Sequence, residues 1–402
     1  MEILYITNGF PFPLTSGYLR HYHLLRGLAP RHKVTLLSVV GSGFDPDHRA
    51  ALDPYANAIH TFGPAAGDST LVKLARRAEG LAHTAASGPV DALRSTAATL
   101  VASGRFDAAV FSGKRTFPVL DALGALPVVV DLCDATSSRV RGGLRFGTLT
   151  QRAGRLFELV EVRRIERSLI RRGDHLVFAS GRDRDLLMMG ADQSRTTVVS
   201  NGVDLEIWTR NSMVLGGSAV VFSGKMDYPP NEHAALHLIE AVMPIVRRSV
   251  PDAELFIVGR DPTPRLMAAA RSGTTVTGYV DDVRPYLERA SVFAAPLHFG
   301  AGIQNKVLEA MAMAVPVVAS SLAAEGVRAG DGSEAPVAVA EEPAAFAAEV
   351  VARLVAAGEG AAPDRAGRVF VERNFTWAEN TQRLEGALEA AQSAWAARRR
   401  VG

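Results

Sequence analysis

Lys306 and Glu309 lie one helical turn apart behind a glycine-rich segment, within the sequence FGAGIQNKVLEAMAMAVP at 299–316. Residues at i and i+3 of a helix share a face, so this ammonium and carboxylate can address one ligand. Gly300 and Gly302 would let the backbone approach that ligand closely, and the free N–H groups of a helix N-terminus favour an anion. A cation for phosphate beside an acceptor for hydroxyls is what a nucleotide-linked sugar needs, and this is our working hypothesis.

Plainer interpretations of the same segment stay open. Lys306 and Glu309 could form a surface salt bridge, which would account for both charges but not for the glycines. The apolar residues of the helix fall on one face and indicate core packing. They are Val307, Ala310, Met311 and Ala314.

Further candidates follow other apolar runs of the second half. In open α/β sheets, ligands bind beyond the carboxyl ends of the strands. Gly224 and Lys225 follow one such run, and the lysine could balance a diphosphate or be an ordinary surface lysine. Arg260 directly follows another apolar run. The backbone of Tyr279 and Val280 could read a nucleobase edge, or belong only to a turn between strand and helix.

Three candidates stand in the first half. Gly17 precedes a helix expected from about Tyr18, and its N–H could meet a phosphate or a reacting sugar; the alternative is a plain turn. Asp131 and Asp134 follow the run PVVVDL. Such carboxylates can orient an acceptor hydroxyl or act as a base, and they can equally cap the next helix or turn.

The bulk composition narrows the class of protein. A chain of 402 residues exceeds the size of one hydrophobic core, so two domains are expected. Lysine and arginine number 44 against 42 acidic residues, a net charge of +2 that does not indicate nucleic-acid binding. The single cysteine, Cys133, excludes an intramolecular disulfide and a multi-cysteine metal site. With no signal-peptide pattern at the N-terminus and no apolar run of membrane-spanning length, a cytoplasmic protein is expected.

Short apolar runs alternate with helical patterns along the chain, which predicts an α/β fold with two doubly wound, Rossmann-like parallel sheets. The boundary is placed near residues 200–218, where helical pattern stops and a glycine-rich turn precedes a new strand. A last helix is expected from Trp377 to about Arg399. The predicted strands are 3–7, 34–40, 108–111, 127–132, 175–179, 219–224, 253–259, 291–296 and 315–320.

Three segments of the second half, FSGKMDYPPN (222–231), TGYVDDV (277–283) and NKVLEAMAMAVPVVAS (305–320), resemble the retaining glycosyltransferases of family 4. GIQNKVLEAMA is also similar to sugar transferases of bacterial exopolysaccharide and surface-glycan clusters. The resemblance implies the GT-B fold, with an acceptor-binding domain at 1–205 completed by a C-terminal helix at 377–402, and a donor-binding domain at 206–376.

The resemblance also implies roles for single residues. Glu309 would bind the ribose hydroxyls, Lys306 and Lys225 the donor diphosphate, and Gly17 would lie near the transferred sugar. Lys306, Asp131 and Asp134 are the candidates for catalysis. The remaining candidates for donor binding are Gly224, Arg260, Tyr279, Val280, His298, Gly300, Ala301, Gly302 and Ile303.

The sequence departs from the family pattern at two positions. Many members carry a glutamate where this chain has Ala301, and many have a histidine near the strand end where it offers Cys133. His298 and the loop backbone are therefore the candidates for recognising sugar hydroxyls.

The implied activity is metal-independent, retaining transfer of a hexose-type sugar without a cofactor, the nucleotide-sugar being a co-substrate. A UDP-sugar is favoured as donor and GDP-mannose comes next, with a glycan, lipid-linked or natural-product hydroxyl as acceptor. No nucleic-acid partner is expected.

Two other functions stay open: a sugar-nucleotide epimerase on the same scaffold, and a non-catalytic protein that binds nucleotide-sugars. The arginine-rich segment 152–172 could touch anionic lipid, although interleaved opposite charges favour a solvated helix. Membrane contact is therefore expected to be peripheral at most.

Overall fold

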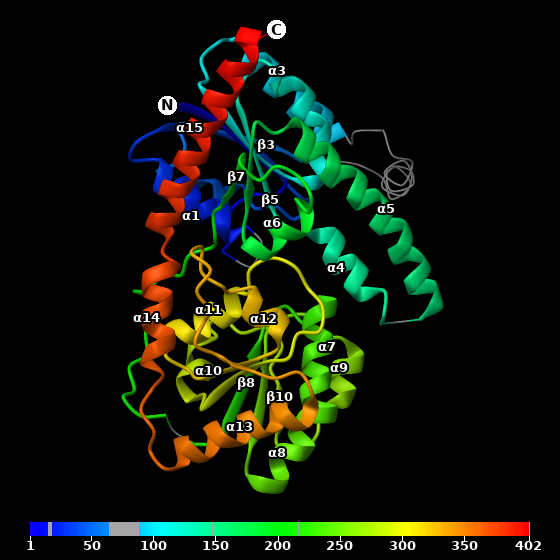
Figure 1. Cartoon of the computed structure of the whole chain (residues 1–402), viewed down its shortest axis with the longest axis vertical. Helices are drawn as coiled ribbons and strands as arrows, with labels where there is room; N and C mark the ends of the chain where they lie inside the picture. Colours follow the sequence, from blue (N-terminus) through cyan, green and yellow to red (C-terminus); the bar gives the residue numbers. More distant parts are fainter. Residues whose placement is uncertain (15–17, 64–87, 147, 216, 402) are drawn as a thin grey trace.

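The computed structural model describes residues 1–14, 18–63, 88–146, 148–215 and 217–401. Two α/β units lie one above the other along the long axis of the molecule (Figure 1). The first contains a seven-stranded sheet of order β3-β2-β1-β4-β5-β6-β7, and the second a six-stranded sheet of order β10-β9-β8-β11-β12-β13. Within each sheet the paired strands run parallel, as in β1 with β2 and β8 with β9. The predicted fold class is confirmed.

The first unit alternates strands with helices along the chain. Its elements are β1 (Glu2–Thr7), α1 (Leu19–Leu28), β2 (Lys33–Val39), η1 (Pro46–Ala51), β3 (Ala58–Phe62), α3 (Gly88–Ala102), β4 (Ala108–Ser112), η2 (Lys114–Leu123), β5 (Val128–Cys133), α4 (Thr136–Gly143), α5 (Leu149–Arg172), β6 (His175–Phe178), α6 (Gly181–Leu187) and β7 (Thr196–Val198).

The second unit follows the same plan and ends in three helices. Its elements are β8 (Ala219–Ser223), α7 (Pro229–His237), η3 (Leu238–Val242), α8 (Met243–Ser249), β9 (Glu254–Val258), α9 (Pro264–Ala269), β10 (Thr274–Val276), α10 (Arg284–Arg289), β11 (Val292–Ala295), α11 (Asn305–Ala312), β12 (Val317–Ala319), α12 (Ser321–Glu325), β13 (Ala338–Val339), α13 (Pro343–Gly358), α14 (Arg365–Asn374) and α15 (Trp377–Val401).

The first sheet is buried on both faces, which explains why its strands are apolar throughout. Successive side chains of a strand point to opposite faces. Ile3 and Tyr5 of β1 therefore join the core under α1 and α15, whereas Leu4 and Ile6 join the core under α3 and α5. All four side chains are fully buried.

The last helix, α15, leaves the second unit and runs along the first (Figure 1). Leu384 and Leu388 are buried in the first core, among residues of β1 and α1. Gly27 of α1 gives α15 its close approach, because a Cβ there would lie 2.1 Å from the Thr381 hydroxyl oxygen. The expected terminal helix from Trp377 is present and packs on the first sheet.

None of the described helices combines the length and apolar character needed to cross a bilayer.

Candidate functional site

The glycine-rich loop between β11 and α11 has the predicted form, a loop that opens a helix. α11 begins at Asn305, and the Gln304 side chain makes no capping hydrogen bond to the first turn. Gly302 has φ of +75°, a left-handed conformation that favours glycine. The first N–H groups of α11 are therefore left for a ligand at the end of the helix that favours anions.

Lys306 is a largely desolvated ammonium group at the head of this helix. It donates to the side-chain oxygen of Asn231, and its Nζ lies 4.7 Å from the centre of the Phe222 ring. Burial lowers its pKa to about 7, against an opposing effect of Glu309. Burial likewise raises the pKa of Glu309 to about 7, with Lys306 acting in the other direction. Perturbed values of this kind are typical of functional sites.

The structure does not support a surface salt bridge between Lys306 and Glu309. Both residues keep part of their surface exposed while their charged groups are buried, and the ammonium group bonds the Asn231 amide oxygen instead of forming an ion pair with Glu309. The two groups stay free to address one ligand from a shared face. The apolar face of the same helix is buried as expected.

Two glycines at the ends of β8 and β9 bring the backbone close beneath Lys306. Gly224 and Gly259 have φ values of +153° and +141°, and a Cβ on Gly259 would lie 1.9 Å from the Gly224 carbonyl oxygen. A Cβ on Gly224 would lie 3.1 Å from Lys306 Nζ. Asn231 holds this corner together, because its amide nitrogen donates to the backbone of the β8–α7 loop while its amide oxygen accepts from Lys306.

The other basic candidates of the second unit have acidic neighbours. Lys225 Nζ lies 2.9 Å from Asp227 and 3.7 Å from Asp261, and Arg260 Nε lies 3.9 Å from Asp261. Both basic side chains are 38% exposed. A diphosphate would have to compete with these carboxylates, so Lys225 and Arg260 are weaker candidates than Lys306.

Two candidates for base recognition sit close together on the loop after β10. The Tyr279 side chain is 67% exposed. Val280 packs against the core of the second unit. Their roles in reading a nucleobase stay predictions.

Asp131 points into the first unit rather than toward the glycine-rich loop. It is 3% exposed, and its Oδ2 accepts from Arg20 Nε at 2.7 Å. Its Oδ1 accepts from the Cys133 backbone N–H at 3.0 Å. Arg20 keeps the pKa of this carboxyl below its ordinary value in spite of burial. As placed, Asp131 is buried and orients Arg20, and its role in catalysis stays a prediction.

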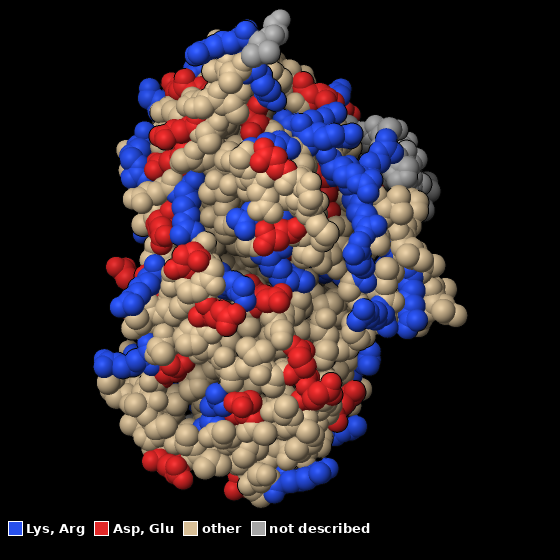
Figure 2. Space-filling model, in the orientation of Figure 1, with Lys and Arg blue, Asp and Glu red and all other residues tan. Residues whose placement is uncertain are grey.

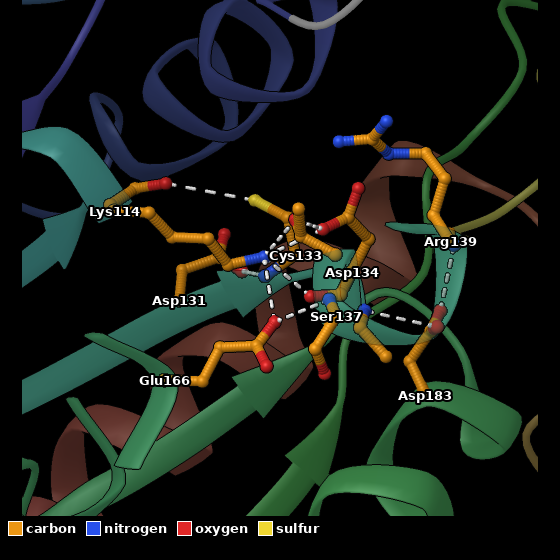
Figure 3. Close-up of polar contacts among 12 residues, drawn as sticks. Lys114, Asp131, Cys133, Asp134, Ser137, Arg139, Glu166 and Asp183 are labelled. Carbon is orange, nitrogen blue, oxygen red and sulfur yellow. Dashed lines mark hydrogen bonds and ion pairs between the residues drawn. The ribbon is translucent and has the colours of Figure 1, made fainter. Parts of the chain in front are cut away.

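Asp134 lies at the end of β5 and is held ionised by a lysine (Figure 3). Lys114 Nζ donates to Asp134 Oδ1 at 2.6 Å, and the Thr136 hydroxyl donates to the same oxygen at 2.5 Å. The lysine and these hydrogen bonds lower the pKa of Asp134. The carboxylate is therefore a hydrogen-bond acceptor and a weak base at neutral pH. It faces the glycine-rich loop, since a Cβ on Gly302 would lie 3.3 Å from Asp134 Cβ.

Cys133 does not supply a base in place of the histidine that is common in the family this sequence resembles. Burial raises the pKa of its thiol to about 12, so the group stays protonated and cannot act as a base at neutral pH.

Residues that the sequence interpretation missed join the two units at this point. Asp183 Oδ2 accepts from the Gly302 backbone N–H at 3.0 Å, and its Oδ1 accepts from the Ala135 N–H at 3.1 Å. Asn201 donates to Asn305 Oδ1 at 2.9 Å. The first unit therefore touches the glycine-rich loop directly. The only local signal for Asp183 was the S-x-x-D pattern of a helix start, with Asp183 three residues after a serine N-cap.

The rest of the loop lies against aromatic rings. His298 is exposed, with its ring centre 4.6 Å from that of His237 on α7. Phe299 stacks on Phe146 of the first unit at 5.0 Å. Ile303 packs against the second core, and Ala301 is partly buried.

Gly17 lies outside the described residues. Among the residues that the structure describes, no three His, Cys, Asp or Glu side chains are grouped so that they could hold a metal ion.

Comparison with known proteins finds a described family to which the second unit is similar. Residues 217–373 match the family model of the glycosyl transferases group 1. The phosphatidyl-myo-inositol mannosyltransferase of Mycobacterium tuberculosis is 32% identical over 143 residues, which are 33% of this chain and 37% of that protein. Its counterpart in Propionibacterium freudenreichii is 29% identical over 134 residues, 33% of its length. The match thus covers little more than a third of the length of these curated relatives.

Solved structures match the whole architecture. The Anabaena protein Alr3699/HepE in complex with UDP and glucose superposes with a TM-score of 0.66 at 14% identity, covering 97% of this chain and 99% of that one. Sucrose-phosphate synthase from Thermosynechococcus elongatus gives a TM-score of 0.69 at 14% identity, covering 96% and 97%. At such identities the likeness concerns the fold, and the fold is GT-B.

Proposed function

We propose that this chain, whose second unit is a glycosyl transferases group 1 domain, transfers a hexose-type sugar from a nucleotide-sugar to a hydroxyl group. The observation that carries the proposal is the head of α11. There a desolvated Lys306 and a desolvated Glu309 share one face, above the close backbone approach of Gly224 and Gly259.

The donor diphosphate would lie at Lys306 and the open N–H groups of α11. Negative charge develops on the diphosphate as its bond to the sugar breaks, and a fixed cation in a desolvated site stabilises that charge without reorganising. Glu309, when ionised, would accept hydrogen bonds from the ribose hydroxyls.

The contact between the units would position the reacting groups. Asp183 fixes the Gly302 N–H, and Asp134 lies beside the same glycine. An acceptor held by the first unit would reach the sugar at this seam, and orientation of two reactants is itself a large part of catalysis.

We further propose a retaining, metal-independent transfer. The leaving diphosphate oxygen takes the proton of the attacking hydroxyl while both groups lie on one face of the sugar. Retention therefore needs no separate base, in keeping with the low pKa of Asp134 and the protonated thiol of Cys133.

A UDP-sugar is our first choice of donor. The fold neighbour from Anabaena is a complex with UDP and glucose, whereas the relatives of the second unit are mannosyltransferases, which keeps GDP-mannose as the next choice. The acceptor is a glycan, a lipid-linked saccharide or a small natural product.

The proposal is tested by a donor screen followed by turnover. Thermal shift with UDP-glucose, GDP-mannose and TDP-glucose identifies the base, and release of the nucleoside diphosphate in the presence of acceptor extracts measures transfer. Acceptor-dependent release with anomeric retention is expected. Conversion of the nucleotide-sugar without acceptor would indicate the epimerase, and binding without any turnover would indicate the non-catalytic protein.

A further inference from the structure

A cavity of about 430 Å³ lies in the first unit, beside the seam and away from the head of α11. It opens between α4, α5 and α6. Three arginines line it, Arg141, Arg163 and Arg167, together with the carboxylate of Glu166. Leu186 belongs to an apolar wall on its α6 side and is 37% exposed. The volume is within the range of about 300–1,000 Å³ typical of small-molecule sites.

Glu166, one of the residues that line the cavity, has a buried carboxylate oxygen without a hydrogen-bond partner among the described residues. Its side chain is 2% exposed, and its Oε1 accepts from the Ser137 backbone N–H at 3.1 Å and lies 3.6 Å from Lys114 Nζ. Its Oε2 has no hydrogen-bond partner among the described residues. A buried acceptor left unpaired is costly and uncommon. A hydroxyl group of a ligand in the cavity would satisfy it if the carboxylate turned toward the cavity.

The arginines give the cavity an excess of positive charge. Three arginines and one glutamate line the cavity, and the glutamate already has Lys114 beside it. In the described part of the chain, no carboxylate lies within 4 Å of the guanidinium of Arg141 or Arg167. Figure 2 shows Lys and Arg side chains gathered in a band on the right of the upper unit, where α5 lies in Figure 1. Planar, unpaired guanidinium groups suit phosphate and carboxylate groups.

The cavity is linked to the glycine-rich loop by hydrogen bonds through Asp183. Ala135 lines the cavity, and its N–H donates to Asp183. The other oxygen of Asp183 accepts from Gly302. Figure 3 shows Glu166, Asp134 and Asp183 around the end of β5. A molecule seated in the cavity would therefore lie next to the seam, on the side of the first unit.

We propose that this cavity binds the non-reacting part of the acceptor, a hydroxylated group that carries a phosphate or carboxylate. Glu166 accepts from one of its hydroxyls, and Arg141 and Arg167 bind its anion. The apolar wall leaves room for a hydrocarbon chain. The same chemistry is therefore found in a free sugar phosphate and in a lipid-linked one. This inference rests on the proposed glycosyl transfer.

Calorimetry on the full chain tests the inference with three probes, in excess UDP so that Lys306 is not available to them. The probes are glucose 1-phosphate, the geranyl diester of that phosphate, and neutral octyl glucoside. Both phosphorylated probes should bind, and octyl glucoside at least about tenfold more weakly, because it lacks the anion. Tighter binding of the geranyl diester identifies a lipid-linked source, and equal binding identifies a free sugar phosphate.

Matched variants on α5 place the binding in the cavity. Arg167→Gln should weaken the phosphorylated probes about tenfold or more, since one charge-assisted contact is lost. Glu166→Gln should also weaken them. Arg164→Gln, an exposed arginine on the same helix outside the lining, should leave affinity within about twofold.

Two results would overturn the inference: no saturable binding of either phosphorylated probe, or equal affinities in Arg167→Gln and Arg164→Gln. Nucleotide binding, measured on the same proteins without probe, separates the two proposals. A wild-type protein that binds nucleotide but neither phosphorylated probe contradicts only the cavity, whereas one that binds no nucleotide contradicts the glycosyl transfer.

Discussion

Replacing Lys306 by Met removes a positive charge from the head of α11 and keeps the length of the side chain. A charge about 4 Å from a phosphate oxygen is worth about 4 kcal/mol at an effective dielectric constant of about 20. The pKa of Lys306 near 7 means that the group is half-protonated at pH 7, and charging it fully costs about 0.4 kcal/mol. The expected loss is about 3–4 kcal/mol, or about 100- to 1,000-fold in affinity.

The assay is calorimetric titration of the nucleotide-sugar that gives the largest thermal shift. Lys225→Met is the matched control: Lys225 lies 2.9 Å from Asp227 and is 38% exposed, so its loss should cost about tenfold or less. The melting temperature of Lys306→Met should stay within a few degrees of wild type, because burying an ammonium is itself unfavourable. A folded Lys306→Met protein that binds within threefold of wild type would contradict the role of Lys306 in holding the diphosphate, as would a larger loss in Lys225→Met.

Four further results are expected. Nucleotide-sugar affinity, measured by calorimetry between pH 5.5 and 8.5, should peak near pH 7. It should weaken at higher pH because Lys306 loses its proton, and at lower pH because Glu309 gains one. Glu309→Gln should abolish the loss of affinity at low pH. Asp183→Ala, which frees the Gly302 N–H, should lower kcat about tenfold or more while donor affinity changes little; unchanged kcat would contradict the role of the seam. Gly259→Ala, whose Cβ would lie 1.9 Å from a backbone oxygen, should lower the melting temperature by about 10 °C or more, and a wild-type melting curve would contradict this packing. Transfer should persist in EDTA, and loss that Mg²⁺ restores would contradict metal independence.

The strands show where sequence patterning works and where it stops. The nine predicted strands correspond to the nine interior strands of the two sheets, with ends shifted by a residue or two. The four that it missed are the four edge strands, β3, β7, β10 and β13. Interior strands are buried on both faces and read as continuous apolar runs, whereas an edge strand such as TTV of β10 is partly exposed and carries no such run.

The candidate site also has parts that a local sequence pattern predicts and parts that depend on contacts between distant segments. Gly300, Gly302, Lys306 and Glu309 lie within one short segment, so local spacing was enough to predict the loop and the helix that carry them. Asp183 meets Gly302 from 119 residues away, and no local pattern encodes that contact. The burial of Asp131 against Arg20 likewise depends on a contact across 111 residues, so a strand-end carboxylate seemed available when it was not.

A crystal structure with the bound nucleoside diphosphate would show whether the head of α11 holds the nucleotide-sugar. UDP, GDP and TDP are screened first, and the one that binds is used. Phosphate oxygens are expected within hydrogen-bonding distance of Lys306 Nζ and of the first N–H groups of α11, and ribose hydroxyls on the Glu309 carboxylate. A nucleotide bound elsewhere, or no binding by any of the three, would contradict this placement of the nucleotide-sugar.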